Sequence, residues 1–328
     1  MWFHLEALNP SILRSISPFT PDPHFSATAT LVCDVSRGFA ITSAVIFIIV
    51  SNQCFTSARR ALAEKLSLFL NRDEANAESW RWFGEGLGWD RARIIAHGDE
   101  FLTEDIENQL TAWLERRTRG EPWAYILGWT IWRGRRFNVT PATLIPRPET
   151  EFVLESAIAL AEQVSARRVV DVGAGSGILG ITLALEINLN VTATDISQEA
   201  LSTARQNALE HGANITWLCC DFLESVPDPI DLVVSNPPYV DPKDKATLQR
   251  ELFFEPAEAL FALDRGLEVI TRLLEQCFER KARGLVIEIG SGQGDELSLR
   301  ASKIGWQVIE IKQDTAKHDR VLVARAIQ

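Results

Sequence analysis

The feature that most constrains the fold is an alternation of short apolar runs with helical stretches over residues 167–290. The apolar runs are Arg168–Val172, Val191–Asp195, Ile215–Asp221, Ile230–Ser235 and Leu285–Ile289. Helical stretches separate the first three runs, and Gly266–Arg280 precedes the fifth. Apolar strands that alternate with helices are typical of a parallel sheet covered on both faces. The sequence therefore predicts an α/β fold.

The last two apolar runs, Trp306–Ile311 and Arg320–Ala326, are joined by a short polar segment. A parallel crossover takes a dozen or more residues, so a connection this short implies an antiparallel pair. We expect a parallel sheet that ends in an antiparallel hairpin.

The chain before this sheet divides into three parts. Residues 1–55 are rich in Pro, Ser and Thr and then apolar, and we expect a poorly ordered extension. Residues 56–119 form a small helical domain, in which Thr103 caps the last helix. Residues 120–148 form a hairpin linker whose arms are Tyr125–Gly128 and Arg136–Val139. Residues 149–328 hold the sheet, and a helix over Glu149–Val164 opens them. The helices expected in the helical domain are Ala58–Leu70, Glu78–Gly86, Arg91–His97 and Thr103–Arg119.

Composition narrows the classes of function. The net charge of −11 weighs against a stable nucleic-acid partner, because phosphate binding needs clustered Lys and Arg. The clustered arginines between Arg116 and Arg136 form, in our interpretation, a solvated face. The five cysteines form no Cys-x-x-Cys pair, so we expect no metal site and a reducing, cytoplasmic location. The apolar run Phe39–Val50 is shorter than the about 20 residues that span a bilayer, so no membrane association is expected.

A glycine-rich turn follows the first strand of the sheet. Its residues are Gly173, Ala174, Gly175, Ser176 and Gly177, and a helix over Ile178–Glu186 comes next. Glycines are needed where the backbone must turn tightly against a ligand, and open α/β sheets bind ligands at this edge. Asp195 ends the next strand, where a carboxylate can accept both hydroxyls of a ribose. Because Gly175, Gly177 and Gly180 also match the dinucleotide fingerprint, the turn alone leaves NAD and S-adenosylmethionine both open.

The end of the third strand, Asp221 and Phe222, has two interpretations. Asp221 can reach an adenine amino group while Phe222 packs on the ring, or the pair is a plain strand end with a core phenylalanine. The second glycine-rich turn, Gly290–Gly294, is followed by no acidic strand end, and we interpret it as structural or substrate-side.

The most specific motif is Asn236-Pro237-Pro238-Tyr239, directly after the fourth strand. Two prolines stiffen the turn and remove two backbone donors. The Asn236 side-chain oxygen and the Pro237 carbonyl can then accept both hydrogens of a substrate NH2 group, while Tyr239 can stack on a flat substrate. An amide nitrogen is a poor nucleophile, and its transfer reaction with a sulfonium methyl group depends on positioning and electrostatics. No metal is required. The motif predicts an S-adenosylmethionine-dependent nitrogen methyltransferase.

From about Ala58 to the end, the chain resembles the release factor glutamine methyltransferases of the HemK type. The resemblance depends on ordered blocks: Gly120-Glu121-Pro122, Ala124–Gly128, Leu144–Glu151, Gly173–Gly177, Asn236–Tyr239, Glu255-Pro256 with Ala259-Leu260, and Asp319-Arg320. Two departures touch a substrate-side loop. Phe254 stands where the family often has Tyr, and Ala262-Leu263 replaces a Gly-Gly pair.

The resemblance implies a class I, Rossmann-like methyltransferase that makes N5-methylglutamine in the Gly-Gly-Gln motif of peptide chain release factors. Gly173–Gly177, Asp195, Asp221, Phe222 and Asn236 would hold S-adenosylmethionine. Asn236–Tyr239 would hold the glutamine, Arg147 and Glu149 would order a loop over the site, and the helical domain would help dock the release factor. We expect a monomer.

Four other functions stay open. Methyltransferases acting on a ribosomal-protein glutamine or on a nucleic-acid amino nitrogen use the same or a closely related acceptor motif. A protein-binding module that kept the fold would bind the cofactor without transferring a methyl group. A dehydrogenase would explain the glycine-rich turn but not Asn236–Tyr239.

Overall fold

The structure is a computed structural model that describes residues 53–187 and 189–327. The predicted extension over residues 1–55 lies outside the described residues except for its last three, and so does the apolar run Phe39–Val50. Phe55 already belongs to the helical part: it is 2% exposed and begins the first helix.

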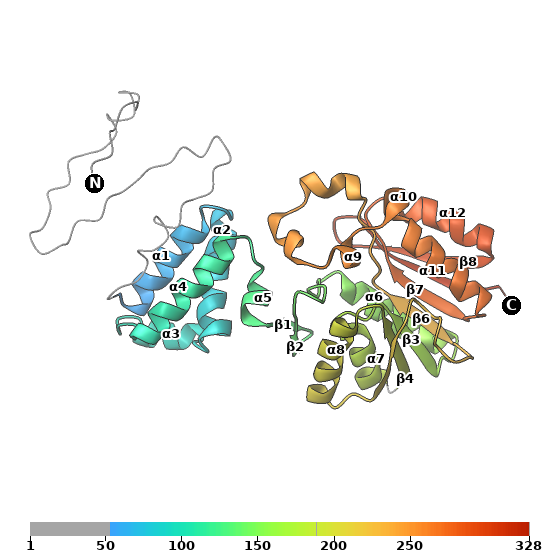
Figure 1. The fold of residues 1–328 in the computed structure, drawn as a ribbon, viewed down its shortest axis with the longest axis horizontal. Helices are drawn as coiled ribbons and strands as arrows, with labels where there is room; N and C mark the ends of the chain where they lie inside the picture. The colour runs from blue at the N-terminus through green and yellow to red at the C-terminus, as the bar shows by residue number, and fades with distance from the viewer. Residues whose placement is uncertain (1–52, 188, 328) are drawn as a thin grey trace, which may run out of the picture.

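The helical part consists of short helices packed around aromatic side chains (Figure 1). They are α1 (Phe55–Leu66), α2 (Arg72–Arg81), the π-helical turn η4 (Trp82–Gly86), α3 (Arg91–His97) and α4 (Glu104–Thr118). The predicted cap of α4 is confirmed, since the Ile106 N–H donates to Thr103 Oγ1 at 3.4 Å. The expected boundaries of α1 and α2 were wrong by several residues. Asn71 begins α2 early, because its side chain and that of Glu74 cap each other's backbone N–H groups.

The segment between the two parts differs from the predicted hairpin. Tyr125–Gly128 is not a strand: α5 (Trp123–Leu127) occupies this segment and ends at Gly128, whose φ is 79°. The helix buries Trp123, Tyr125 and Ile126 on one side, and Trp123 stacks on Trp82 at a ring distance of 4.6 Å. The hairpin comes later, from β1 (Trp129–Trp132) and β2 (Arg135–Asn138). Tertiary burial of the aromatic residues outweighs the local strand propensity of this segment.

The sheet has seven strands in the order β5-β4-β3-β6-β7-β9-β8 (Figure 1). The strands β3 to β7 are parallel, whereas β9 pairs antiparallel with both β7 and β8. The α/β architecture with an antiparallel final hairpin is therefore confirmed. The strands are β3 (Arg168–Val172), β4 (Asn190–Asp195), β5 (Ile215–Cys219), β6 (Leu232–Ser235), β7 (Gly284–Glu288), β8 (Trp306–Gln313) and β9 (Asp319–Ala326).

Helices cover both faces of the sheet, and each face has its own core cluster. Side chains alternate along the strands: in β3, Val169 belongs to one cluster, while Val170 and Val172 belong to the other. The first face packs against α6 (Thr150–Gln163), α7 (Ile178–Ile187) and α8 (Gln198–His211). The second packs against α11 (Glu268–Glu279) and α12 (Gly294–Ile304). This layering brings the carboxyl ends of β3, β4 and β6 together at one edge.

A loop with four short helices follows β6. They are η5 (Pro242–Thr247), η6 (Arg250–Phe254), α9 (Ala257–Leu260) and α10 (Leu263–Gly266). Over residues 53–187 and 189–327, no helix has both the length and the apolar character needed to cross a membrane.

Candidate active site

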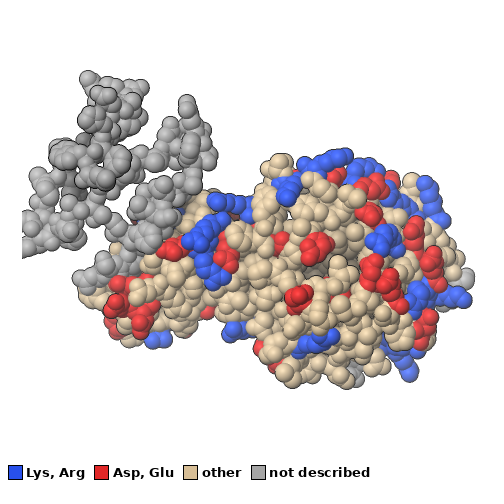
Figure 2. Space-filling model, viewed as in Figure 1, with Lys and Arg blue, Asp and Glu red and all other residues tan. Residues whose placement is uncertain are grey.

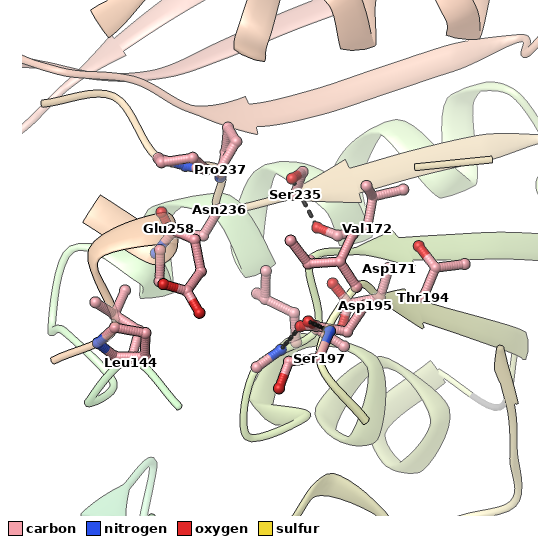
Figure 3. A pocket seen from close by; sticks show the side chains of 18 of the residues that line it. Leu144, Asp171, Val172, Thr194, Asp195, Ser197, Ser235, Asn236, Pro237 and Glu258 are labelled. Atoms are coloured by element: carbon pink, nitrogen blue, oxygen red, sulfur yellow. Dashed lines mark hydrogen bonds between the residues drawn. The ribbon is translucent and has the colours of Figure 1, made fainter. Parts of the chain in front are cut away.

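A cavity of about 230 Å³ lies at the carboxyl ends of β3, β4 and β6. The glycine-rich turn and Asp195 line it, and the acceptor motif lines it through Asn236, Pro237 and Pro238. In Figure 3, Asn236 and Pro237 lie on one side of the cavity and Asp195 and Ser197 on the other. The two strongest motifs of the sequence, more than forty residues apart in numbering, thus share one cavity.

The glycine-rich turn has the backbone geometry that only glycine adopts without strain. The φ angles of Gly173, Gly175 and Gly177 are 70°, 56° and 84°. A Cβ atom on Gly173 or Gly175 would meet nothing within 4 Å, whereas one on Gly177 would lie 2.9 Å from Ile181 Cδ1. The first two glycines therefore leave open space beside the backbone, and the third allows the turn to pack closely on α7 and its neighbours.

Asp195 is anchored by the backbone at the mouth of this turn. Its Oδ2 accepts from the Gly175 N–H at 2.9 Å, and its Oδ1 accepts from the Ser197 N–H at 2.9 Å. Burial raises the pKa of Asp195, while these two N–H groups oppose the rise. A carboxylate has about four acceptor positions, so two remain for a ligand.

Asp221 and Phe222 both line the cavity at the end of β5. Arg272 of α11 donates to Asp221 Oδ2 at 2.8 Å and lies 4.9 Å from the centre of the Phe222 ring. Phe222 also packs against the second core cluster. It therefore lines the cavity, as the ligand-binding interpretation expects, and contacts the core, as the other interpretation expects. Arg272 is a lining residue that sequence reasoning missed, because only the fold brings α11 to this strand end.

Tyr239 turns away from the other residues of its motif. It is absent from the cavity lining, and its hydroxyl donates to Glu288 Oε1 at 3.1 Å. Its ring packs against the second core cluster, and burial raises its pKa. In this arrangement the Tyr239 ring does not face the cavity, because its hydroxyl binds a buried carboxylate. The predicted stacking on a substrate therefore does not fit the position of this ring.

Arg147 and Glu149 lie beside the cavity and do not line it. Arg147 forms an ion pair with Glu255, whose Oε2 accepts from the Ile145 N–H at 3.0 Å. Glu149 Oε1 lies 4.0 Å from Arg320 Nη2 on β9. Glu255 is buried and belongs to the loop after β6, so its contacts tie that loop to the segment around Arg147.

The second glycine-rich turn supports the acceptor motif from behind. The Gln293 Nε2 donates to the Tyr239 carbonyl at 3.1 Å, and a Cβ on Gly266 would lie 1.9 Å from the same oxygen. Gly290–Gly294 contributes nothing to the cavity lining. Of the two interpretations left open, the structural one fits this position.

Only part of the arginine cluster is a solvated face: Arg119, Arg133 and Arg136 are exposed, whereas the others are more enclosed. Arg117 is 3% exposed and pairs with Glu78 and Glu251, while Arg116 pairs with Glu121. Arg133 and Arg135 both pair with Glu186, and Arg136 lies over the Trp129 ring. Figure 2 shows charges of both signs interspersed over the face in view. Acidic side chains therefore pair with four of the arginines that the sequence shows as one group: Arg116, Arg117, Arg133 and Arg135.

Four further polar side chains at the site escaped sequence reasoning as functional candidates: Thr150, Glu255, Glu258 and Glu288. Thr150 and Glu258 line the cavity, and Figure 3 shows the Glu258 carboxylate projecting into it. Glu288 offers the one sequence signal that could have found it, a carboxylate inside an apolar strand. Within residues 53–187 and 189–327, no group of three or more His, Cys, Asp and Glu side chains could hold a metal ion.

The chain is similar to several known proteins. Residues 150–263 match the family described as "Methyltransferase small domain", and residues 54–128 match the "PrmC N-terminal domain". The hMettl16 catalytic domain in complex with MAT2A 3'UTR hairpin 6 aligns with a TM-score of 0.48 at 16% identity, over 67% of this chain and 82% of that chain. The release factor glutamine methyltransferase of Neisseria gonorrhoeae is 38% identical over 245 residues, which are 72% of this chain and 88% of that protein. That of Staphylococcus aureus is 38% identical over 242 residues, 71% of this chain and 86% of that protein. The identity to these two relatives, over more than two thirds of each chain, and the match to the PrmC N-terminal domain lead to one conclusion: the chain belongs to the release factor glutamine methyltransferase family.

Proposed function

We propose that this protein transfers a methyl group from S-adenosylmethionine to the N5 nitrogen of the glutamine in the Gly-Gly-Gln motif of peptide chain release factors. The observation that carries the proposal is the shared cavity, in which Asn236 and Pro237 face the glycine-rich turn and Asp195. The names of the relatives support the choice of substrate.

The cavity residues fit S-adenosylmethionine. The open space beside Gly173 and Gly175 lets a ligand lie against the backbone of the turn. Asp195 has free acceptor positions for ribose hydroxyls. Asp221 and Phe222, with Arg272 bound to both, form a place for a flat base. When bound there, S-adenosylmethionine supplies an electrophilic methyl group on a positively charged sulfur.

The acceptor motif would prepare the glutamine nitrogen. An amide nitrogen is a weak nucleophile, because its lone pair is delocalised into the carbonyl. Asn236 Oδ1 and the Pro237 carbonyl would accept hydrogen bonds from the two N–H groups, orient the nitrogen and favour the positive charge that develops on it. The nitrogen–carbon bond would form as the sulfur–carbon bond breaks, so that a neutral thioether leaves, and the nitrogen would release one proton to solvent. Positioning supplies most of the acceleration, so none of these residues forms a covalent bond to the substrate.

The loop after β6 would close the site over the substrate. Arg147 and Glu255 hold it to the segment before α6, and Arg117 holds it to the helical part through Glu251. We infer that Arg147 orders this loop, and that Glu149 contributes by pairing with Arg320. The helical domain over residues 56–119 and the hairpin linker over residues 120–148 would then present the release factor to the cavity.

The proposal extends to the location, the oligomeric state and the partners of the protein. It acts in the cytoplasm, where release factors work, as a monomer that binds no nucleic acid stably. Arginines paired with acidic side chains across the described part of the chain support the last point.

The test mixes the protein, methyl-labelled S-adenosylmethionine and a bacterial-type release factor. A release factor with the Gly-Gly-Gln glutamine changed to Ala serves as the control. Label on the first protein and not on the second is the expected result. If the cofactor binds but neither protein is labelled, the release factor is not the substrate. Ribosomal proteins, RNA and DNA are then tested in the same assay, and cofactor binding without any transfer would indicate a binding module.

A further inference from the structure

A series of hydrogen bonds links Asn236 to Thr150, at the edge of the cavity, and then to Glu288, which does not line it. Asn236 Nδ2 donates to Thr150 Oγ1 at 3.1 Å, and Thr150 Oγ1 donates to Glu288 Oε2 at 2.8 Å. The Tyr239 hydroxyl donates to the other oxygen, Oε1, at 3.1 Å. Thr150 and Glu288 are each 1% exposed. Thr150 begins α6, Glu288 ends β7, and Asn236 and Tyr239 lie in the turn after β6.

The protons in this series of hydrogen bonds can be assigned from chemistry. An ionised carboxylate only accepts hydrogen bonds, so the single proton of the Thr150 hydroxyl must point to Glu288. Toward Asn236 the hydroxyl can then only accept. Of the two ends of the Asn236 amide, only the NH2 end donates, so this end faces Thr150. The oxygen Oδ1 must lie at the opposite end of the amide.

The two ends of an asparagine amide have almost the same size and shape, but one end donates hydrogen bonds and the other accepts them. Packing alone does not distinguish them. A glutamine NH2 group brings two donors and must meet acceptors. An Asn236 turned by 180° would present its own donors to those of the substrate, leaving buried N–H groups unpaired on both sides.

Building on the proposed function, we propose that Thr150 and Glu288 are positioning residues that hold the Asn236 amide with its oxygen toward the substrate nitrogen. Neither residue needs to touch the glutamine. They act through Asn236 and determine that the site accepts an NH2 donor. Tyr239 completes the arrangement by occupying the second oxygen of Glu288, which leaves Oε2 for Thr150.

A purely structural role for the pair predicts different behaviour. Loss of packing would lower stability and weaken every ligand together. Loss of orientation lowers the rate of methyl transfer while the folded protein, the cofactor affinity and the KM for the release factor stay close to wild type.

The test compares three variants. Thr150→Val removes the hydroxyl and keeps the shape, and Thr150→Ser keeps the hydroxyl. Thr182→Val makes the same replacement at a fully buried threonine on α7 whose hydroxyl has no hydrogen-bond partner among the described residues. The measurements are kcat, KM for the release factor, cofactor affinity by calorimetry and the melting temperature. We expect Thr150→Val to lower kcat about 10- to 100-fold, Thr150→Ser to restore most of that loss, and Thr182→Val to behave as wild type.

A second measurement is independent of activity. Selective ¹⁵N labelling of asparagine lets NMR follow hydrogen exchange at the Asn236 Nδ2 protons. One of them is expected to exchange slowly in wild type and in Thr182→Val, and rapidly in Thr150→Val. Unchanged kcat in Thr150→Val, a parallel loss of cofactor affinity, or equally fast exchange in wild type would each overturn the proposal. A wild-type protein that fails to methylate release factors refutes the proposed function, and the exchange measurement still decides the orientation of Asn236.

Discussion

Neighbouring residues of one motif have opposite surroundings at this site. Asn236 and Pro237 face the cavity, while Tyr239 faces a buried carboxylate at the end of the adjacent strand β7. The prolines between them set the direction of the backbone, and the partner of each side chain decides its role. At the scale of single residues, function therefore depends on hydrogen-bond partners as much as on residue type.

Replacement of Asn236 tests the acceptor itself. We expect Asn236→Ala to lower kcat about 100- to 1,000-fold, because an oriented polar group that meets developing charge is lost. Single-turnover transfer to a release factor measures this. Asn214→Ala, an exposed asparagine beyond α8, is the control and should keep the wild-type rate. A normal rate in Asn236→Ala would show that the amide does not take part.

The buried Glu288 predicts a dependence of the rate on pH. Burial, with a smaller contribution from the nearby Glu149, raises its pKa to about 7, although Thr150, Tyr239 and Arg320 oppose the rise. A protonated Glu288 can donate to Thr150, which frees the threonine proton for Asn236 Oδ1 and allows the amide to turn. The transfer rate should therefore fall as pH drops through about 7.

The check is a pH–rate profile of wild type and Glu288→Gln from about pH 5.5 to about pH 8.5, a range that spans this pKa. A glutamine does not titrate, so the acid limb due to Glu288 should be missing in the variant. The same acid limb in both proteins would assign the titration to another group.

At the scale of elements, the loop after β6 is held by contacts from three directions. Arg117 of α4 donates to Glu251 of η6 at 2.5 Å and to Glu78 of α2 at 2.7 Å. Glu255 binds Arg147 on another side, and Gln293 binds the Tyr239 carbonyl from behind. The loop that covers the cavity is thus coupled to the helical part, and changes at this contact should affect both.

Replacement of Arg117 tests this coupling. Arg117→Met leaves Glu78, whose side chain is 10% exposed, without its charged partner. Breaking a buried ion pair by removing one partner costs about 3–5 kcal/mol of unfolding free energy. Urea unfolding measures the loss. Glu251→Gln should cost far less, because the Glu251 side chain is 36% exposed and Arg117 keeps Glu78. Equal losses in both variants would contradict this assignment.

At the scale of the whole molecule, the sheet separates two core clusters and gathers polar groups at its carboxyl edge. Two buried carboxyl groups lie there, Asp171 and Glu288, and burial raises the pKa of each to about 7. In the folded protein, both groups lie in an environment that favours their neutral forms. Ionisation of both groups in the folded protein therefore lowers the free energy of unfolding.

This effect of ionisation predicts the direction in which stability changes with pH. The folded-state pKa of each group lies above its unfolded value, so folding takes up protons between about pH 4 and pH 7. The stabilisation is complete below that window and is lost as pH rises through about 7. Unfolding free energy should increase from pH 8 to pH 5 by up to about 1.4 kcal/mol per pH unit for each proton taken up.

Urea midpoints at several pH values measure this slope. Asp171→Asn removes one titrating group and should flatten the curve over the same window. A stability that falls on acidification from pH 8 to pH 5, or an identical slope in the variant, would contradict the assignment.

The sequence by itself determined the features that depend on local backbone chemistry. The apolar strands, the antiparallel end of the sheet, the glycine-rich turn and the rigid acceptor turn all follow from periodicity, glycine and proline within a few residues. The strands of the sheet lie within a few residues of their predicted ranges. The meeting of the turn, Asp195 and Asn236 followed too, because the carboxyl ends of parallel strands share one edge.

Only the tertiary structure decided which polar side chains meet. Arg147 finds Glu255 at a separation of 108 residues, Arg117 finds Glu251 at 134, and Thr150 finds Glu288 at 138. Such pairs depend on which strand lies beside which, and no local pattern contains that information. The same holds for α5, where burial of aromatic rings against the helical part overrode a strand-like sequence. Packing over long separations therefore oriented Tyr239, paired Arg117 with acidic side chains and set the direction of Asn236, while local chemistry built the elements that carry them.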